Sequence, residues 1–301
     1  MIEGEVAPAK INLAQDILFR RSDNYHEVAM VMASIDLSDY LTFELIPEDK
    51  IIVETSRAFL PEDNRNHAYQ AAQLMKKVGN IKTGVHISIE KRIPVAAGLG
   101  GGSTDAAAVF RKLNTLWDIN LPLKELQALA NQVGSDVAYS IAGGTALVEG
   151  RGEKIRQIQP APKCWIILAK PAISVSTRKI FNQLDVERLN YEPNAPKVLA
   201  ALESGSYEDL MAAIGNSLEP VTFSQHPKLA KLKQQMLDFG ADGVTMSGSG
   251  PTIIGFTQVY SRGQRIYNAL RGFCQEVYMV RVMPEINDVF RNESNEESKP
   301  S

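Results

Sequence analysis

The chain has few cysteines, no strong excess of charge and no long apolar run. Of its 301 residues only Cys164 and Cys274 are cysteines, and their wide separation favours two free core thiols over a disulfide or a metal site. The net charge of −3 argues against a broad nucleic-acid surface. No apolar run approaches the ~18 residues of a membrane span, and no basic-then-apolar leader is present. We therefore expect a cytoplasmic protein with no membrane or nucleic acid among its partners.

What the sequence does contain is the composition of a folded globular protein. It is 44% hydrophobic and 22% charged, and its length favours two domains. Two prolines on either side of Ala161 bracket a change from polar to apolar sequence, and we expect the domain boundary there. This predicts one domain over residues 1–160, a second over residues 161–289 and a disordered polar tail over residues 290–301.

One stretch, residues 94–108, dominates the pattern. It follows an alternating strand, residues 85–90, whose pairing Pro94 ends. Ser103 is placed to cap the helix that comes next. A glycine-rich loop that leads into a helix N-terminus is typical of a phosphate site, because the free N–H groups and the helix dipole both favour an anion. The loop has four glycines within five residues, namely Gly98, Gly100, Gly101 and Gly102.

The familiar phosphate fingerprints do not fit this loop. A Walker A loop needs a lysine after its glycines, and dinucleotide and protein-kinase loops need a glycine or alanine where Ser103 stands. A tight turn without a ligand is the alternative, which so many glycines before Ser103-Thr104 disfavour. The pattern Pro-x-x-x-Gly-Leu-Gly-x-x-Ser therefore predicts a phosphate loop of another kind.

Further candidate site residues are spread along the chain. In an extended segment Lys10 and Asn12 share one face. Tyr25 and His26 open an apolar strand, and Asp136 would ordinarily be a helix N-cap. A second glycine-rich loop, whose plain interpretation is a hairpin turn, consists of Ser247, Gly248, Ser249 and Gly250.

Three predictions of local structure bear on these candidates. Pro8 is expected to end a first strand, residues 3–7, because proline has no N–H for the ladder. Residues 40–46 and 51–54 are expected to form a hairpin. Asn66 is expected to cap the helix that starts after it.

Taken in order, three stretches resemble the motifs of the GHMP small-molecule kinases. They are Ala-Pro-Ala-Lys-Ile-Asn-Leu at residues 7–13, the glycine loop at residues 94–104, and Met-Ser-Gly-Ser-Gly-Pro-Thr at residues 246–252. The resemblance spans residues 6–282, nearly the whole chain. It implies a two-domain α+β fold with the active site in the cleft between the domains, and ATP-dependent phosphorylation of a small alcohol.

Two shorter segments resemble one member of that family, a kinase acting on a cytidine diphosphate-linked methylerythritol. They are Asp-Asn-Tyr-His-Glu at residues 23–27 and Gly-Ser-Asp-Val at residues 134–137. The resemblance implies transfer of the ATP γ-phosphate to the 2-hydroxyl of that alcohol, a step of the non-mevalonate route to isoprenoid precursors.

The same resemblance implies roles for individual residues. Asp136 corresponds to the catalytic acid and Lys10 to its basic partner. The implied contacts to the cytidine side of the substrate are Asn12, Tyr25, His26 and Phe181. The implied ATP contacts are Asn66, Pro94, Val95, Ala96, Ala97, Gly98, Leu99, Gly100, Gly101, Gly102, Ser103 and Thr104.

The metal and the partners are less well defined. Mg²⁺ is expected to ride on the phosphates and on water, with Ser103 as a candidate hydroxyl, and its protein ligands stay unassigned. The expected partner is the cytidine-linked alcohol, bound by a monomer or a homodimer. One alternative is another GHMP kinase, for homoserine or a mevalonate-type alcohol, which Tyr25-His26 disfavour because those substrates have no base. The other is a non-catalytic binding module of related fold, which the net charge and the Lys10 and Asp136 motifs disfavour.

Overall fold

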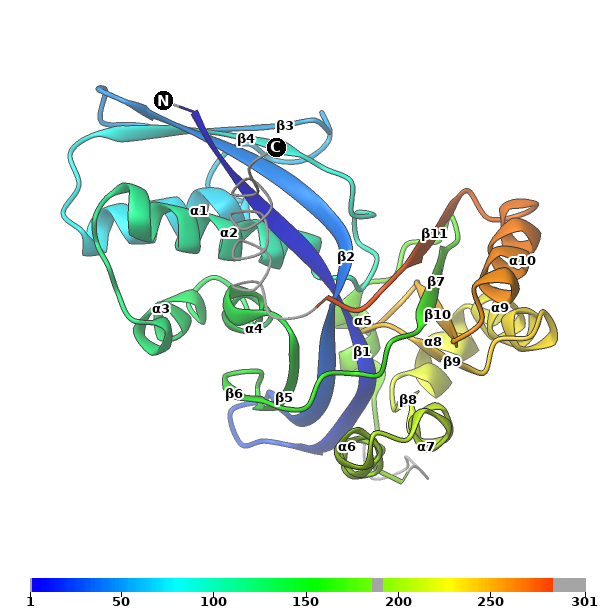
Figure 1. Ribbon diagram of the computed structural model, residues 1–301. Helices are drawn as coiled ribbons and strands as arrows, with labels where there is room; N and C mark the ends of the chain where they lie inside the picture. The colour runs from blue at the N-terminus through cyan, green and yellow to red at the C-terminus, as the bar shows by residue number, and fades with distance from the viewer. Residues whose placement is uncertain (1, 186–191, 284–301) are drawn as a thin grey trace, which may run out of the picture. The chain divides into compact units, whose positions relative to one another are not determined.

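The structure, a computed structural model, describes residues 2–185 and 192–283 (Figure 1). The tail predicted at residues 290–301 lies outside these ranges. The chain divides into two compact units, each built from separate segments of sequence. Among the described residues, unit 1 contains residues 2–9, 37–95 and 100–143, and unit 2 contains residues 10–36, 96–99, 144–185 and 192–283. The domain boundary expected near residue 160 stays a prediction.

Runs of strands and runs of helices follow one another along the chain, as in an α+β protein. The strands are β1 (Ile2–Arg20), β2 (His26–Ile46), β3 (Ile51–Thr55), β4 (Gly84–Glu90), β5 (Thr145–Gly150), β6 (Lys154–Gln157), β7 (Trp165–Lys170), β8 (Gly215–Asn216), β9 (Gly243–Met246), β10 (Ile253–Thr257) and β11 (Glu276–Val280). The helices are α1 (His67–Val78), α2 (Gly101–Leu116), α3 (Leu123–Ala130), α4 (Val137–Ala142), α5 (Thr177–Gln183), α6 (Ala195–Ser204), α7 (Tyr207–Ala213), α8 (Glu219–Gln225), α9 (Pro227–Asp238) and α10 (Tyr260–Arg271).

The sheet of unit 1 has β4 between β2 and β3. Tyr40 of β2 pairs antiparallel with Glu90, whereas Ile51 of β3 pairs parallel with Val85. The predicted hairpin of residues 40–46 with residues 51–54 is therefore wrong. Both segments are strands, but β3 and β4 are joined through α1, a crossover connection of the kind that parallel strands require, and β4 separates β3 from β2.

Strand β1 continues through Pro8, so the predicted break at this proline is wrong. Proline removes one N–H but keeps an extended backbone, and a strand passes through any position that does not need that N–H for its ladder. The continuity matters for the site, because Lys10 and Asn12 follow Pro8 within the same strand.

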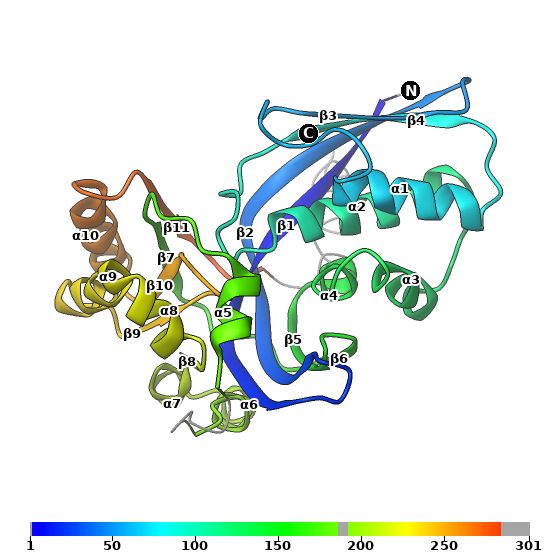
Figure 2. The same ribbon diagram turned by 180° about the vertical axis from the view of Figure 1, so that it is seen from behind.

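The core of unit 1 forms where the sheet meets two helices. Alternation in β4 buries Val85, Ile87 and Ile89, as the sequence pattern predicts. Helices α1 and α2 contact each other and lie side by side below the strands (Figures 1 and 2). The buried face of α1 consists of Ala68, Ala71, Ala72 and Met75. Because three of these side chains are small alanines, α1 can pack closely against its neighbours, α2 among them.

Unit 2 contains an antiparallel sheet in the order β11-β7-β10-β9, against which α9 and α10 pack. Strand β5 pairs with β2 and β6, and β8 pairs with β1. Cys164 and Cys274 are free and buried, which confirms the prediction of core thiols. Burial, with the charge of Asp242, raises the pKa of Cys164 to about 12. Among the described residues, no helix has both the length and the apolar composition to cross a bilayer.

Candidate functional site

In unit 1, the glycine loop runs directly into α2. Gly100 is the N-cap residue, with φ 72°, and α2 begins at Gly101. The expectation that Ser103 caps this helix is wrong, because Ser103 lies inside the first turn. Gly100 adopts a left-handed φ that glycine tolerates, so the helix begins at Gly101, three residues before it would have begun with Ser103 as its cap. The first N–H groups of a helix have no partner within it, so those of Gly101 and Gly102 are the natural anion donors.

The backbone around Gly102 leaves room for more than a hydrogen. A Cβ on Gly102 would lie 3.7 Å from its nearest neighbour, Nδ1 of His67, which is ordinary van der Waals contact. A Cβ on Gly101 would lie 3.3 Å from Cγ2 of Ile93 and 3.4 Å from Nζ of Lys91. The fold therefore restricts Gly101 more than Gly102. Burial lowers the pKa of His67, so this imidazole is neutral beside the start of α2.

In unit 2, residues of all three sequence motifs meet at the other part of the loop. The backbone N–H of Lys10 donates to the carbonyl of Leu99 at 3.0 Å. Oγ of Ser247 donates to the carbonyl of Gly98 at 2.9 Å. Ser249 and Thr177 share a hydrogen bond between their hydroxyls at 2.7 Å. The loop Ser247–Gly250 also joins the antiparallel strands β9 and β10, so it is a hairpin turn as well as a support for Gly98.

Lys10 and Asn12 lie on one face of β1, as alternation in an extended strand predicts. Nζ of Lys10 donates to Oδ1 of Asn12 at 2.9 Å, and both residues are buried. Nδ2 of Asn12 contacts Sδ of Met30 at 3.6 Å. The amide of Asn12 thus holds the ammonium of Lys10 in a defined place inside unit 2.

Asp136 occupies the N-cap position of α4 in unit 1. Among the described residues, its side chain caps no N–H of that helix. The plain role of a helix cap therefore does not explain why an acid stands there. Lys10 belongs to unit 2 and Asp136 to unit 1, so the pairing of the two stays a prediction.

The residues predicted to contact cytidine form an aromatic group in unit 2. The rings of His26 and Phe181 lie 5.4 Å apart between centroids, tilted by 51°. Tyr25 is 59% exposed, and the guanidinium of Arg151 stands 5.0 Å from its ring centroid. Burial, with the nearby charge of Arg20, lowers the pKa of His26. A neutral imidazole carries one donor and one acceptor nitrogen.

Sequence reasoning missed Arg151. The sequence around it, Gly150-Arg151-Gly152-Glu153, is a turn signal and nothing more. The structure confirms the turn, since the N–H of Arg151 donates to Oε2 of Glu153 at 2.6 Å. The turn places the guanidinium of Arg151 over the ring of Tyr25. No local sequence pattern predicts this tertiary contact.

Asn66 caps α1, as predicted. Its Oδ1 accepts the N–H of Ala68 at 2.9 Å, and its Nδ2 donates to the carbonyl of Pro61 at 2.8 Å. Both ends of the amide are therefore used within the fold. A role of Asn66 in binding adenine stays a prediction.

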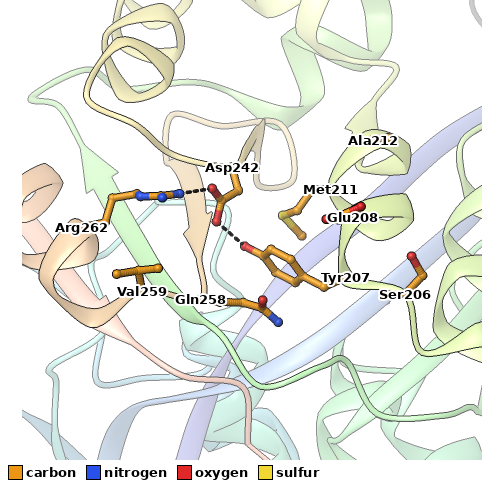
Figure 3. Close-up of a pocket in the computed structure, with 9 residues that line it drawn as sticks. All are labelled: Ser206, Tyr207, Glu208, Met211, Ala212, Asp242, Gln258, Val259 and Arg262. Atoms are coloured by element: carbon orange, nitrogen blue, oxygen red, sulfur yellow. Dashed lines mark hydrogen bonds and ion pairs between the residues drawn. The ribbon is translucent and has the colours of Figure 1, made fainter.

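A pocket of about 750 Å³ in unit 2 contains none of these residues (Figure 3). The hydroxyl of Tyr207 donates to Oδ2 of Asp242 at 3.1 Å, and Arg262 pairs with the other carboxylate oxygen. Burial, with the charge of Asp242, raises the pKa of Tyr207. Both carboxylate oxygens of Asp242 already have partners within the protein, Tyr207 and Arg262. We therefore assign no ligand to this pocket.

No cluster of three or more histidine, cysteine or acidic side chains suited to a metal ion occurs in the described ranges. Ser103, in the first turn of α2, stays the candidate hydroxyl for Mg²⁺.

Comparison with known families matches two parts of the chain. Residues 66–144 match the N-terminal domain of the GHMP kinases, and residues 198–276 match their C-terminal domain. The first match covers α1 and the glycine loop, and the second ends inside β11.

Curated relatives match nearly the full chain. The 4-diphosphocytidyl-2-C-methyl-D-erythritol kinase of Bacillus licheniformis is 53% identical over 285 residues, which cover 95% of this chain and 98% of that protein. The enzyme of the same name from Enterococcus faecalis is 52% identical over 279 residues, covering 93% of this chain and 98% of that protein.

Solved structures of similar fold include two kinds of kinase. A crystal structure of 4-(cytidine 5'-diphospho)-2C-methyl-D-erythritol kinase superposes with a TM-score of 0.80 at 31% identity, covering 93% of this chain and 99% of that one. A homoserine kinase from Cytophaga hutchinsonii superposes with a TM-score of 0.76 at 19% identity, covering 94% of this chain and 95% of that one. At that lower identity the likeness concerns the fold alone.

Proposed function

We propose that this chain, which belongs to the GHMP kinases and within them to the 4-diphosphocytidyl-2-C-methyl-D-erythritol kinases, phosphorylates the 2-hydroxyl of 4-diphosphocytidyl-2-C-methyl-D-erythritol. ATP is the phosphoryl donor. The reaction is a step of the non-mevalonate route to isopentenyl diphosphate. The observation that carries the proposal is the identity of 53% to a curated kinase of this name, over 95% of the chain.

The proposed mechanism rests mainly on positioning. Phosphoryl transfer passes through a loose transition state that needs alignment and charge neutralisation more than a strong nucleophile. In our proposal Asp136 orients the 2-hydroxyl and accepts its proton, and Lys10 offsets the charge that develops on the transferring group. The Lys10–Asn12 hydrogen bond of 2.9 Å supports this role, because it restricts the Lys10 side chain to few rotamers and so reduces the entropy lost when the ammonium is positioned.

The glycine loop is proposed to hold the phosphates of ATP. The start of α2 supplies N–H groups and the positive end of a helix dipole. The N–H groups of Gly101 and Gly102 would hold the β-phosphate. Mg²⁺ is the proposed cofactor; the Ser103 hydroxyl is the residue that would help to hold it, and the ion would neutralise phosphate charge.

Cytidine recognition is proposed for the aromatic group of unit 2. A cytosine ring has a π-face that an aromatic side chain covers, and a Watson–Crick edge that pairs with donors and acceptors. Tyr25 is exposed and therefore available for stacking. His26, held against Phe181 and neutral because its pKa is lowered, offers one donor and one acceptor to the edge.

Substrate-dependent release of ADP tests the proposal. The purified chain is given ATP and Mg²⁺ with the cytidylyl alcohol, with homoserine or with mevalonate, and ADP is measured by a coupled assay. We expect turnover with the cytidylyl alcohol only. Equal turnover with all three alcohols would refute the assignment within the family while leaving the kinase class, and no turnover with any would refute both. We further propose that the protein is cytoplasmic, which fractionation of cells would test, and that it is a monomer or homodimer, which sedimentation of the purified chain would test.

A further inference from the structure

A cluster of three buried ionisable side chains lies in unit 1, beside the glycine loop. Nζ of Lys91 donates to Oδ2 of Asp39 and, at 2.5 Å, to Oδ2 of Asp105. The three side chains are 4%, 0% and 6% exposed. They come from three places in the chain, because Lys91 follows β4, Asp39 lies in β2 and Asp105 lies in α2.

The same cluster fixes the segment that enters the loop. Oδ1 of Asp39 accepts the backbone N–H groups of Arg92 and Ile93, at 2.5 Å and 2.8 Å. The backbone N–H of Lys91 donates to Oγ of Ser56 at 2.9 Å. Residues 91–93 therefore have their N–H groups held one after another, immediately before the loop begins.

The cluster also holds the segment that leaves the loop. Asp105 comes directly after Thr104, the last residue of the proposed ATP contacts, and its carboxylate is tied to Lys91. Nζ of Lys91 would lie 3.4 Å from a Cβ placed on Gly101, so the ammonium sits under the first turn of α2. One side chain thus links the two ends of the glycine loop within unit 1.

Stability alone is a poor explanation for this arrangement. A buried ion cluster stabilises a fold less than well-packed apolar side chains of the same volume do. Here Oδ1 of Asp105 has no hydrogen-bond partner among the described residues, and neither has Oγ1 of the adjacent Thr104. Buried polar groups left in this state mark a place where something other than stability sets the residue types.

We propose that Lys91, Asp39 and Asp105 are positioning residues that clamp both ends of the glycine loop in the geometry that binds the phosphates of ATP. The inference rests on the proposed function for the identity of the anion. The inference goes beyond the proposed function because it assigns the shape of the glycine loop to three residues that are not themselves proposed to contact the phosphates.

The charges of the cluster suit this role. Burial raises the pKa of Asp105, and the charge of Asp39 adds to the rise while Lys91 opposes it. Burial alone would lower the pKa of Lys91, but the two carboxylates outweigh it and raise that pKa. The ammonium of Lys91 lies between the two acids and so offsets negative charge beside a site proposed for an anion. Asn at position 105 would keep an Oδ1 atom that can accept a hydrogen bond from Nζ of Lys91, whereas Leu would not.

The test compares variants of the cluster with a matched buried ion pair on the same helix. Arg111 of α2 pairs with Glu5 at 2.9 Å, and their side chains are 13% and 6% exposed. Glu5→Gln is the control, because it weakens a buried pair on α2 in the same unit but away from the glycine loop. For each variant, the affinity for an ATP analogue with Mg²⁺, the KM of both substrates, kcat and the melting temperature are measured.

Lys91→Met is expected to raise the dissociation constant of the ATP analogue and the KM for ATP about tenfold to hundredfold, the usual result of misplaced binding groups. The KM for the cytidylyl alcohol should change far less. Asp105→Asn, which keeps an oxygen acceptor for Nζ of Lys91, should weaken ATP affinity much less than Asp105→Leu does. Glu5→Gln should lower the melting temperature without altering ATP affinity.

Lys91→Arg keeps the proposal testable if Lys91→Met does not fold. It retains the charge, but a planar guanidinium does not reproduce a point contact between two carboxylates beside Gly101, so ATP affinity should still fall. A folded Lys91 variant with wild-type ATP affinity would overturn the inference, as would equal losses in Glu5→Gln. Because the analogue measures ATP binding alone, a wild-type chain that binds ATP but turns over no alcohol would refute the proposed function and not this inference.

Discussion

Gly98 and Gly102 belong to the same loop, yet their surroundings differ. Gly98 has φ 76°, and a Cβ there would lie 2.3 Å from the carbonyl oxygen of Ser247. A Cβ on Gly102 would find its nearest neighbour at 3.7 Å. Contacts within the protein therefore require glycine at position 98 but not at position 102. A phosphate bound at this N–H, as we propose, would give position 102 a reason to be glycine.

Two helix starts in unit 1 show the same contrast. Asn66 accepts the N–H of Ala68 at 2.9 Å and so does the work of a cap. Asp136 holds the same position on α4, but its side chain caps no N–H of that helix. Substitution of Asn66, which caps α1, should therefore cost stability, whereas substitution of Asp136, in its proposed catalytic role, should cost activity. The predictions below test that division.

The largest effect is expected from Asp136→Asn. The side chain of Asp136 caps no N–H of α4, and Asn suits the N-cap position about as well as Asp, so the melting temperature should hardly change. Removal of a general base costs about 10²–10⁴-fold in rate, and the loss should fall on kcat. Kinetics and a melting curve on the same preparation check both parts. A folded variant with near-normal kcat would contradict the role of Asp136.

The control for that experiment is a serine that does cap its helix. Oγ of Ser206 accepts the N–H of Asp209 at 3.2 Å at the start of α7. Ser206→Ala should cost about 0.5–2 kcal/mol of stability and leave kcat unchanged.

Lys10→Met should lower kcat as Asp136→Asn does, because Lys10 is the proposed partner of Asp136. The variant with both substitutions should be little worse than the worse of the two single variants if the two residues act as a unit.

The next effect is expected from Gly102→Ala. Alanine inside a helix is about 1 kcal/mol more favourable than glycine, and the space is available, so the variant should be at least as stable as the wild type. Its methyl group would stand between the backbone and the phosphate. Loss of a hydrogen bond to a charged group costs about 1.5–3 kcal/mol, which predicts a rise of about tenfold to hundredfold in the KM for ATP.

Gly98→Ala is the matched change at the other kind of glycine. It should lower the melting temperature, because the left-handed φ and the carbonyl of Ser247 both oppose a Cβ. Higher stability with weaker ATP binding at position 102, against lower stability at position 98, is the expected pair of results. Unchanged ATP kinetics in Gly102→Ala would remove the reason for a glycine there.

A smaller effect, on the other substrate, is expected from Tyr25→Ala. Stacking of a base on an aromatic side chain is worth about 1–3 kcal/mol, so kcat/KM for the cytidylyl alcohol should fall about tenfold to hundredfold while the KM for ATP stays nearly constant. Tyr267 of α10 is a suitable control, since it also has an arginine, Arg271, 5.6 Å from its ring centroid. Tyr267→Ala should leave both substrate constants unchanged. A loss of stability without a loss of affinity in Tyr25→Ala would make Tyr25 a structural residue.

Local patterns in the sequence were enough for much of the fold. Alternation in residues 85–89 predicts the buried face of β4, and Asn66 at a helix start predicts its cap, because both depend on near neighbours. The predicted hairpin of residues 40–46 with 51–54 failed for the opposite reason. The strands were recognised, but their partner, β4, comes some 30 residues later, and no local signal reveals it.

The candidate site divides in the same way. The glycine loop and the Lys10–Asn12 face were predictable because each is a short segment whose residue types carry the chemistry. The contact of Arg151 with Tyr25 and the cluster of Lys91, Asp39 and Asp105 were not, because they join distant segments through tertiary packing. In the sequence, Asp105 looks like an ordinary acid near a helix start, and Lys91 looks like a charged residue after a strand.

The smallest effect on catalysis is expected from Ser247→Ala, in the loop that supports Gly98. Ser247 is fully buried, and its Oγ donates to the carbonyl of Gly98 at 2.9 Å. Losing this donor inside the protein should cost about 1–3 kcal/mol of stability. The loop keeps its other supports, including the hydrogen bond from Lys10 N–H to the Leu99 carbonyl, so the KM for ATP should stay within about threefold, or about 0.7 kcal/mol.

Ser217 provides the matched control for Ser247, as an equally buried serine whose Oγ accepts the N–H of Ile17 at 3.0 Å, outside the glycine loops. Ser217→Ala should lower the melting temperature to a similar extent and leave the KM for ATP unchanged. If Ser247→Ala instead raises the KM for ATP as much as Gly102→Ala does, the hairpin loop takes part in binding the nucleotide. Gly98 would then be required for ATP binding as well as for the fold, because its hydrogen bond with Ser247 would position the loop for the nucleotide. The contrast between Gly98, required by the fold, and Gly102, required by the ligand, would fail.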